Sequence, residues 1–254
     1  MQGRLRFLTI TALTLAACSP AAAQAADGNP PVSVQQAAGT SVAAIQSAVD
    51  AYRNDLGTLN PPNPGSVGSG RREIGWDGVP DALSAPNLLP PDFFNVNSPR
   101  GVVFSTRGRG FQVSANAGVA PIEFDNLNPT YSSLFTPFSP QRLFTALNSN
   151  ELTVRFFIPG SQTPATSAGF GAVFSDVDRP GTKIDYFDAR NRRLATYAVP
   201  VSPGEETLSF LGVRFLNARV ARVRITSGNV NPGRSEGRGR DAVVMDDFIF
   251  GEPA

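Results

Sequence analysis

The stretch LGVRFLNARVARVRI, residues 211–225, contains two runs in which apolar and polar side chains alternate. The first run has Leu, Val and Phe at every second position from 211 to 215, and the second has Ala, Val and Ile at every second position from 221 to 225. Successive side chains of a β-strand point to opposite faces of its sheet. Each run therefore predicts a short strand with one buried face and one face toward solvent.

Similar runs recur on both sides of this stretch, separated by turn residues. They lie at residues 101–106, 111–115, 152–158, 170–177, 184–186, 194–199 and 243–250. The segments 107–110 and 188–191 join neighbouring runs and are typical of hairpin turns. Since no helical segment separates the strands, the pattern predicts an all-β fold, an antiparallel β-sandwich of jelly-roll-like type.

One helix is expected, near the N-terminus. The apolar residues Val42, Ile45, Val49, Tyr52 and Leu56 recur at helical spacing. Ser41 is a suitable N-cap and Gly57 a suitable stop. We therefore expect residues 26–70 to comprise a flexible tether, this helix and a loop, and residues 71–254 to form the sandwich.

Residues 1–25 have the pattern of a secretory signal peptide. Two arginines precede an uncharged apolar run at residues 7–17, and small residues follow. Ala23-Gln24-Ala25 fits an A-x-A cleavage site, which would release a chain that begins near Ala26. Leu15-Ala16-Ala17-Cys18 fits a lipobox, in which Cys18 would be lipidated. We expect a secreted, periplasmic or outer-envelope protein, attached to a membrane only if Cys18 carries lipid.

The composition excludes several kinds of chemistry. The chain has no histidine and one cysteine, which removes Ser-His-Asp catalysis and every metal site built on imidazole. Carboxylate chemistry, oxygen-ligand metal sites and simple binding remain. The formal net charge is +1, so the chain lacks the basic footprint that nucleic-acid binding requires.

Three segments resemble secreted bacterial β-sandwich proteins of uncharacterised activity, related to exported proteins with a C-terminal Pro-Glu-Pro tag. They are GFGAVFSDVD at 169–178, VVMDDFIFGE at 243–252 and RREIGWDGVP at 71–80. The chain ends in Gly-Glu-Pro-Ala, so the resemblance does not extend to that tag. The Asp-Asp strand is also similar to the closing strand of galactose-binding-like and MAM-type jelly-roll modules. That second resemblance implies a structural calcium near the strand and binding of glycans or protein partners at loop edges.

Two pairs of aspartates are candidate metal ligands. Asp246 and Asp247 lie on one predicted strand, so they are expected on opposite faces, with one toward the interior. A buried carboxylate is costly unless a calcium ion, an arginine or a hydroxyl group satisfies it. Asp176 and Asp178, followed by Pro-Gly, resemble an oxygen-ligand loop. The alternative for the second pair is an ordinary solvated turn.

Trp76 is the only tryptophan and lies among charged residues. With Arg72, Glu73 and Asp77 it is a candidate ligand-binding group, in which the indole would stack on a sugar ring. The alternative is a core tryptophan, with Glu73 paired to an arginine.

The sequence leaves three functions open. We expect an exported non-catalytic β-sandwich that binds an extracellular partner, a glycan or a cell-surface protein, with calcium as a structural ion. A glycan hydrolase or lyase that uses acidic residues is the first alternative, and it requires two carboxylates in a cleft. A structural surface or matrix protein without a small ligand is the second.

Overall fold

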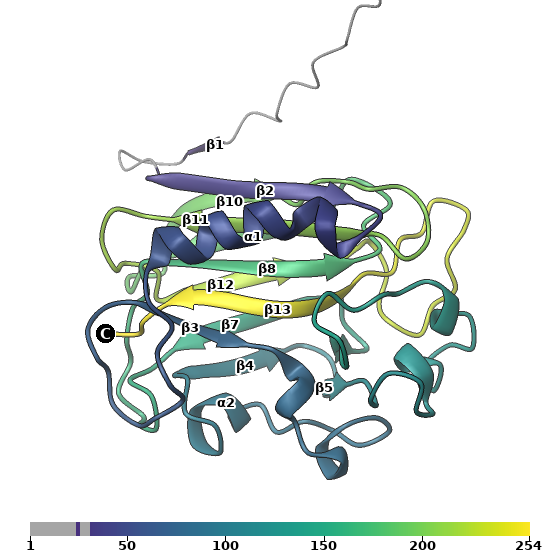
Figure 1. Ribbon diagram of the computed structural model, residues 1–254, viewed down its shortest axis with the longest axis horizontal. Coiled ribbons are helices and arrows are strands. Elements are labelled where there is room, and N and C mark those ends of the chain that lie inside the picture. Colours follow the sequence, from purple (N-terminus) through teal and green to yellow (C-terminus); the bar gives the residue numbers. More distant parts are fainter. Residues whose placement is uncertain (1–23, 26–30) are drawn as a thin grey trace, which may run out of the picture.

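The computed structural model describes Gln24–Ala25 and residues 31–254, and it is a β-sandwich of two antiparallel sheets (Figure 1). Sheet A has six strands in the order β1-β10-β9-β12-β7-β4. Sheet B has seven, in the order β2-β11-β8-β13-β6-β5, with β3 paired to β13. The predicted all-β sandwich with one N-terminal helix is confirmed. Cys18 and most of the predicted leader lie outside the described residues.

The strands of sheet A are β1 (Gln24–Ala25), β4 (Val102–Thr106), β7 (Glu151–Phe156), β9 (Lys183–Phe187), β10 (Arg193–Ala198) and β12 (Arg222–Thr226). Those of sheet B are β2 (Ser33–Gly39), β3 (Arg71–Ile74), β5 (Gly110–Val113), β6 (Phe144–Leu147), β8 (Gly169–Ser175), β11 (Leu208–Arg214) and β13 (Val244–Gly251). The helices are α1 (Val42–Leu56) and the short α2 (Phe93–Val96), with single 3₁₀ turns at Trp76–Gly78, Asp81–Leu83, Ile122–Phe124 and Tyr131–Ser133.

The main core lies between the two sheets. On β12, Val223 and Ile225 are fully buried, whereas Arg222 and Arg224 on the opposite face are partly exposed. The predicted alternation on residues 221–225 is therefore confirmed, and it places the arginines on the outer face of sheet A. The aromatic residues Trp76, Phe144 and Phe248 pack together at the centre of this core.

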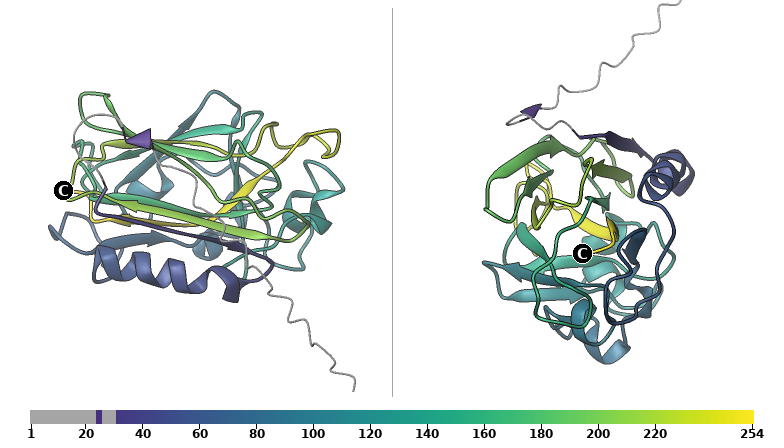
Figure 2. Two further views of the ribbon diagram at one scale, coloured as in Figure 1. Left: turned by 90° about the horizontal axis from the view of Figure 1, so that it is seen from above. Right: turned by 90° about the vertical axis from the view of Figure 1, so that its left-hand side faces the viewer.

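Helix α1 covers the outer face of sheet B, as Figures 1 and 2 show. It begins after Ser41 and ends at Gly57, as the sequence predicts. Tyr52 lies flat against β11 at Gly212, where an added Cβ would be 2.6 Å from the Tyr52 Cγ. The Tyr52 hydroxyl donates a hydrogen bond to the Val213 carbonyl, at 3.1 Å. The glycine thus allows the helix to approach the sheet closely.

Two expectations about strands are wrong. Part of the expected tether forms β2, which pairs along its whole length with β11 and satisfies the backbone groups of that strand. The runs at 101–106 and 111–115 do not form a hairpin, because β4 pairs with β7 in sheet A and β5 pairs with β6 in sheet B. The segment between them crosses from one sheet to the other. The second predicted hairpin, β9 and β10, is confirmed.

Among the described residues, no helix combines the length and the apolar character that crossing a membrane requires.

Candidate metal centre

Two loops at one end of the sandwich bring acidic side chains together. Strand β8 ends at Ser175, and Asp176 follows it with a left-handed backbone, φ 70°. β13 is the neighbour of β8 in sheet B, and the polar loop 229–241 leads into it. Asp and Asn tolerate the left-handed region better than most residues, which explains why an aspartate fits at this turn.

Asp176, Asp178 and Glu236 converge across these loops. Each offers a carboxylate oxygen, and the three oxygens lie within 4.8 Å of one another. Asp176 is fully buried, and the other two are partly exposed. Carboxylate oxygens are the ligands of hard cations, so this buried acidic group could bind a metal ion.

Asp176 is the least satisfied member of the group. No described residue donates a hydrogen bond to either of its carboxylate oxygens. Burial raises the pKa of Asp176 to about 9, and the negative charges of Glu236, Asp178 and Asp241 contribute to that rise. A buried carboxylate without a donor is expensive to ionise, and a bound cation would remove that cost.

The other acidic side chains fix the loops around Asp176. Asp241 accepts hydrogen bonds from the backbone N–H groups of Asp178 and Arg179, at 3.2 and 3.3 Å. Asp178 accepts one from the Gly204 N–H at 2.7 Å, and Glu236 accepts one from the Ala242 N–H at 2.7 Å. These bonds hold the candidate ligands in place without a metal ion.

Glu236 and Asp241 also have raised pKa values. Burial raises the pKa of Glu236 to about 7 and that of Asp241 to about 6. The sequence pattern does not single out either residue. The only signal is that their polar loop leads into the strand that carries the Asp-Asp resemblance, and the pairing of β13 with β8 then brings that loop beside Asp176.

Asp246 and Asp247 lie apart from this group, farther along β13. A β-bulge between Met245 and Phe248 shifts the register with β8. Met245 and Phe248 both belong to the core between the sheets, while the two aspartates contact groups outside sheet B. The expectation that they point to opposite faces is therefore wrong, because a bulge adds one residue to the strand.

Each of these two aspartates has protein partners. Asp246 accepts hydrogen bonds from the Phe138 N–H at 2.6 Å, the Ser139 N–H at 3.1 Å and the Ser139 hydroxyl at 3.0 Å. Asp247 lies 3.5 Å from the guanidinium of Arg53. Burial raises the pKa of both carboxyl groups, that of Asp247 to about 6. Backbone and hydroxyl donors thus satisfy Asp246, whereas Asp247 has Arg53 beside one oxygen and no hydrogen-bond donor to its buried Oδ1 among the described residues.

The candidate ligand-binding residues around Trp76 do not form one surface. Trp76 is fully buried and stacks on Phe144, with ring centroids 4.0 Å apart and ring planes at 5°. A sugar ring cannot reach the indole there, so Trp76 is a core tryptophan, which was the alternative to a ligand-binding role. Asp77 accepts hydrogen bonds from the Gln141 and Arg142 N–H groups, and Glu73 pairs with Arg53 at 2.9 Å.

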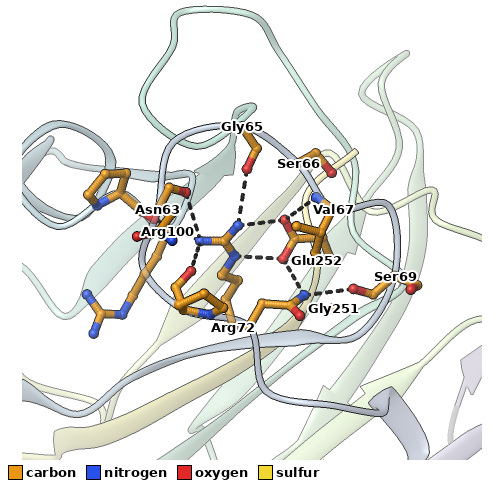
Figure 3. Close-up of polar contacts among 12 residues, drawn as sticks. Asn63, Gly65, Ser66, Val67, Ser69, Arg72, Arg100, Gly251 and Glu252 are labelled. Carbon is orange, nitrogen blue, oxygen red and sulfur yellow. Dashed lines mark hydrogen bonds and ion pairs between the residues drawn. The ribbon is translucent and has the colours of Figure 1, made fainter.

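Arg72 is buried in an ion pair with Glu252, and Figure 3 shows the surrounding contacts. Its Nε and Nη2 donate to the two Glu252 carboxylate oxygens at 2.6 and 2.8 Å. Its remaining N–H groups donate to backbone carbonyls of the loop 57–70 and of Pro99. Glu252 also accepts hydrogen bonds from the Asn60 side chain and the Val67 N–H. All of these groups are occupied by the protein, so Arg72 joins the loop to the end of β13.

No protein-family model matches the chain, and no curated protein matches it. Among solved structures, it is similar to the enzymatically active domain of tailspike protein 4 from bacteriophage CBA120, with 15% sequence identity and a TM-score of 0.29. The match covers 64% of this chain and 20% of the other, so this chain spans about a fifth of that structure's length. The likeness is distant.

Proposed function

We propose that this chain is an exported, non-catalytic β-sandwich module that binds an extracellular partner, a glycan, and is stabilised by a calcium ion between Asp176, Asp178 and Glu236. The strongest support for the calcium ion is the environment of Asp176. Its side chain is fully buried among other acids, and neither of its carboxylate oxygens accepts a hydrogen bond from the described residues. A protein fold keeps such a group at a large cost unless a ligand offsets that cost.

Calcium fits this group better than magnesium does. The candidate ligands are carboxylates on two loops, and Ca²⁺ accepts six to eight oxygen ligands in flexible geometry. Magnesium requires near-ideal octahedral geometry and gives up its water reluctantly. The absence of histidine and the scarcity of cysteine disfavour zinc and other softer metals.

We expect calcium to raise the melting temperature of protein that has been stripped with a chelator. At a free calcium concentration one hundred times the Kd, a ligand that binds only the folded state adds about 2.7 kcal/mol. For a domain of this size that corresponds to a shift of about 5–10 °C. Thermal unfolding followed by circular dichroism, with magnesium at equal concentration as the control, measures the shift. An unchanged melting temperature in millimolar calcium would exclude the calcium site.

Export is the part of the proposal that depends on the leader. We expect the protein recovered from its native host to lack the first seventeen residues at least, because both cleavage patterns lie beyond them. Intact-mass spectrometry of the recovered protein tests this, and it distinguishes a chain that begins near Ala26 from one that begins at an acylated Cys18. A recovered chain that still begins at Met1 would contradict export through this signal.

A further inference from the structure

The outer face of sheet A carries a row of arginines. Strand pairing places Arg222 on β12 directly between Arg155 on β7 and Phe187 on β9. Two residues along β12, Arg224 lies between Thr153 and Asp185. Like charges directly opposite each other on neighbouring strands destabilise a sheet, so the pair of Arg155 and Arg222 has an energetic cost in the free protein.

Nearby carboxylates do not neutralise this pair. Asp185 forms an ion pair with Arg224 at 2.8 Å, and Asp188 forms one with Arg192 at 2.8 Å. Among the described residues, no carboxylate pairs with Arg155 or Arg222. Burial lowers the pKa of Arg222, and the charges of Arg155 and Arg224 lower it further. The sheet thus presents positive charge that its own acidic residues leave unpaired.

Arg222 is held in a fixed position. Its guanidinium lies over the Phe187 ring, 3.7 Å from the ring centroid, and both its Nε, at 3.1 Å, and its Nη2 donate to the Asn191 side-chain oxygen. Stacking and these two bonds fix the orientation of the N–H groups that remain on Nη1 and Nη2, and a pair of such groups can recognise a carboxylate. Because the position is preset, binding requires little further ordering of the side chain.

Two hollows meet at Arg222. One has a volume of about 580 Å³ and is lined by Arg155, Arg222 and Asn191, by apolar residues such as Phe157 and Pro164, and by Asp188, whose carboxylate is paired with Arg192. The other, of about 250 Å³, is lined by three arginines, by three hydroxyl-bearing residues and by one acid: Arg222, Arg224, Arg107, Ser105, Thr106, Thr153 and Glu151. We call the two together the arginine trough. It crosses the strands of sheet A and offers charge, hydroxyl and amide groups along its length.

We propose that the arginine trough binds a carboxylated glycan, with a sugar carboxylate held between Arg155 and Arg222. This rests on the proposed function, since it names the class of glycan. Arginine binds carboxylates with two parallel hydrogen bonds, and the hydroxyl and amide groups match sugar hydroxyls. Nucleic acid fits less well, because Arg222 already covers the Phe187 ring, which therefore offers no surface for a stacked base.

The test is the affinity for short oligogalacturonate, measured by isothermal titration calorimetry in calcium-free buffer. We expect binding to oligogalacturonate, and at least about tenfold weaker binding to its methyl ester, because a charged hydrogen-bonded pair is lost. Arg222→Gln and Arg155→Gln should each weaken binding by about tenfold or more. Arg214→Gln, on β11 of sheet B, is the matched control and should leave the affinity unchanged.

If the arginines served only to stabilise the sheet, Arg155→Gln would lower the melting temperature. We expect the opposite, because removing one of two adjacent like charges should raise the melting temperature slightly while the affinity for oligogalacturonate falls. Equal affinity for the methyl ester or for neutral dextran, unchanged affinity in both trough variants, or tighter binding of single-stranded DNA would each overturn the proposal.

The trough test and the calcium test are independent. Figure 1 shows the C-terminus, which lines the larger hollow, at the left-hand end, whereas the loop 229–241 lies at the right-hand end. The trough variants should therefore keep the calcium-induced thermal shift. Binding of neutral glycans would support the proposed function and refute the carboxylate preference. Oligogalacturonate binding without a calcium shift would refute the calcium site alone.

Discussion

Replacement of Arg72 by methionine is expected to lower the free energy of unfolding by about 3–5 kcal/mol, because it leaves Glu252 buried without its partner. Both side chains of this ion pair are 1% exposed, so water cannot take the place of the guanidinium. The substitution also removes the donors to four backbone carbonyls. Urea unfolding followed by tryptophan fluorescence measures the loss, since the single tryptophan is in the core.

Arg71→Met is the matched control for this prediction. The neighbouring arginine pairs with Glu73 at 2.6 Å, but its side chain is 17% exposed. Glu73 also pairs with Arg53 at 2.9 Å, so its charge keeps a partner in this variant, which should lose less stability than Arg72→Met. The double variant Arg72→Met/Glu252→Gln should recover part of the loss, because the buried negative charge is then absent. Equal destabilisation by the two single methionine variants would contradict the account of a buried ion pair.

The second large effect is expected at Asp176, where Asp176→Asn should have opposite consequences with and without calcium. Without metal, the amide removes an acid that is buried beside Asp178 and Glu236 and is costly to ionise, so the free energy of unfolding at neutral pH should rise by about 1–3 kcal/mol. With calcium, the variant has lost a ligand, so the calcium-induced thermal shift should disappear. Asparagine keeps the left-handed backbone at this position, which alanine would strain.

Asp92→Asn provides the control for this substitution. Asp92 is exposed and lies before α2, far in sequence from the acidic group. The Asp92→Asn substitution should change neither the free energy of unfolding without metal nor the calcium-induced thermal shift. A variant Asp176→Asn that is less stable without metal would show that the carboxylate has a protein partner, and a retained calcium shift would show that the ion binds elsewhere.

Local patterns in the sequence predict the fold class but not the strand partners. The alternation at residues 221–225 correctly gives a strand, because burial on one face determines it. The same reasoning predicts that residues 101–106 and 111–115 form a hairpin, but the two strands belong to different sheets. A crossing between sheets depends on packing across the core, and alternation contains no information about that packing. Likewise, the polar and small residues of β2 acquire their strand conformation from the edge of β11.

The candidate metal centre could be predicted only in part for a similar reason. Asp176 and Asp178 are two positions apart in the chain, so their sequence spacing draws attention to them. Glu236 joins them only through the pairing of β8 with β13, which no local pattern reveals. The bulge on β13 also places Asp246 against the donors of Phe138 and Ser139 and Asp247 beside Arg53, which alternation in the sequence does not predict. One added residue in a strand is enough to change which carboxylates need a partner.

The position of β13 determines which contacts sheet B needs in order to form. Val244–Gly251 lie between β8 and β6 in the sheet and also pair with β3, so every partner of this strand comes from a distant part of the chain. The sheet therefore cannot be built from local hairpins alone, because its central strand requires pairings between distant segments. Loop-closure entropy has to be lost before such pairings stabilise the chain, and folding of this sheet is expected to be slow for that reason.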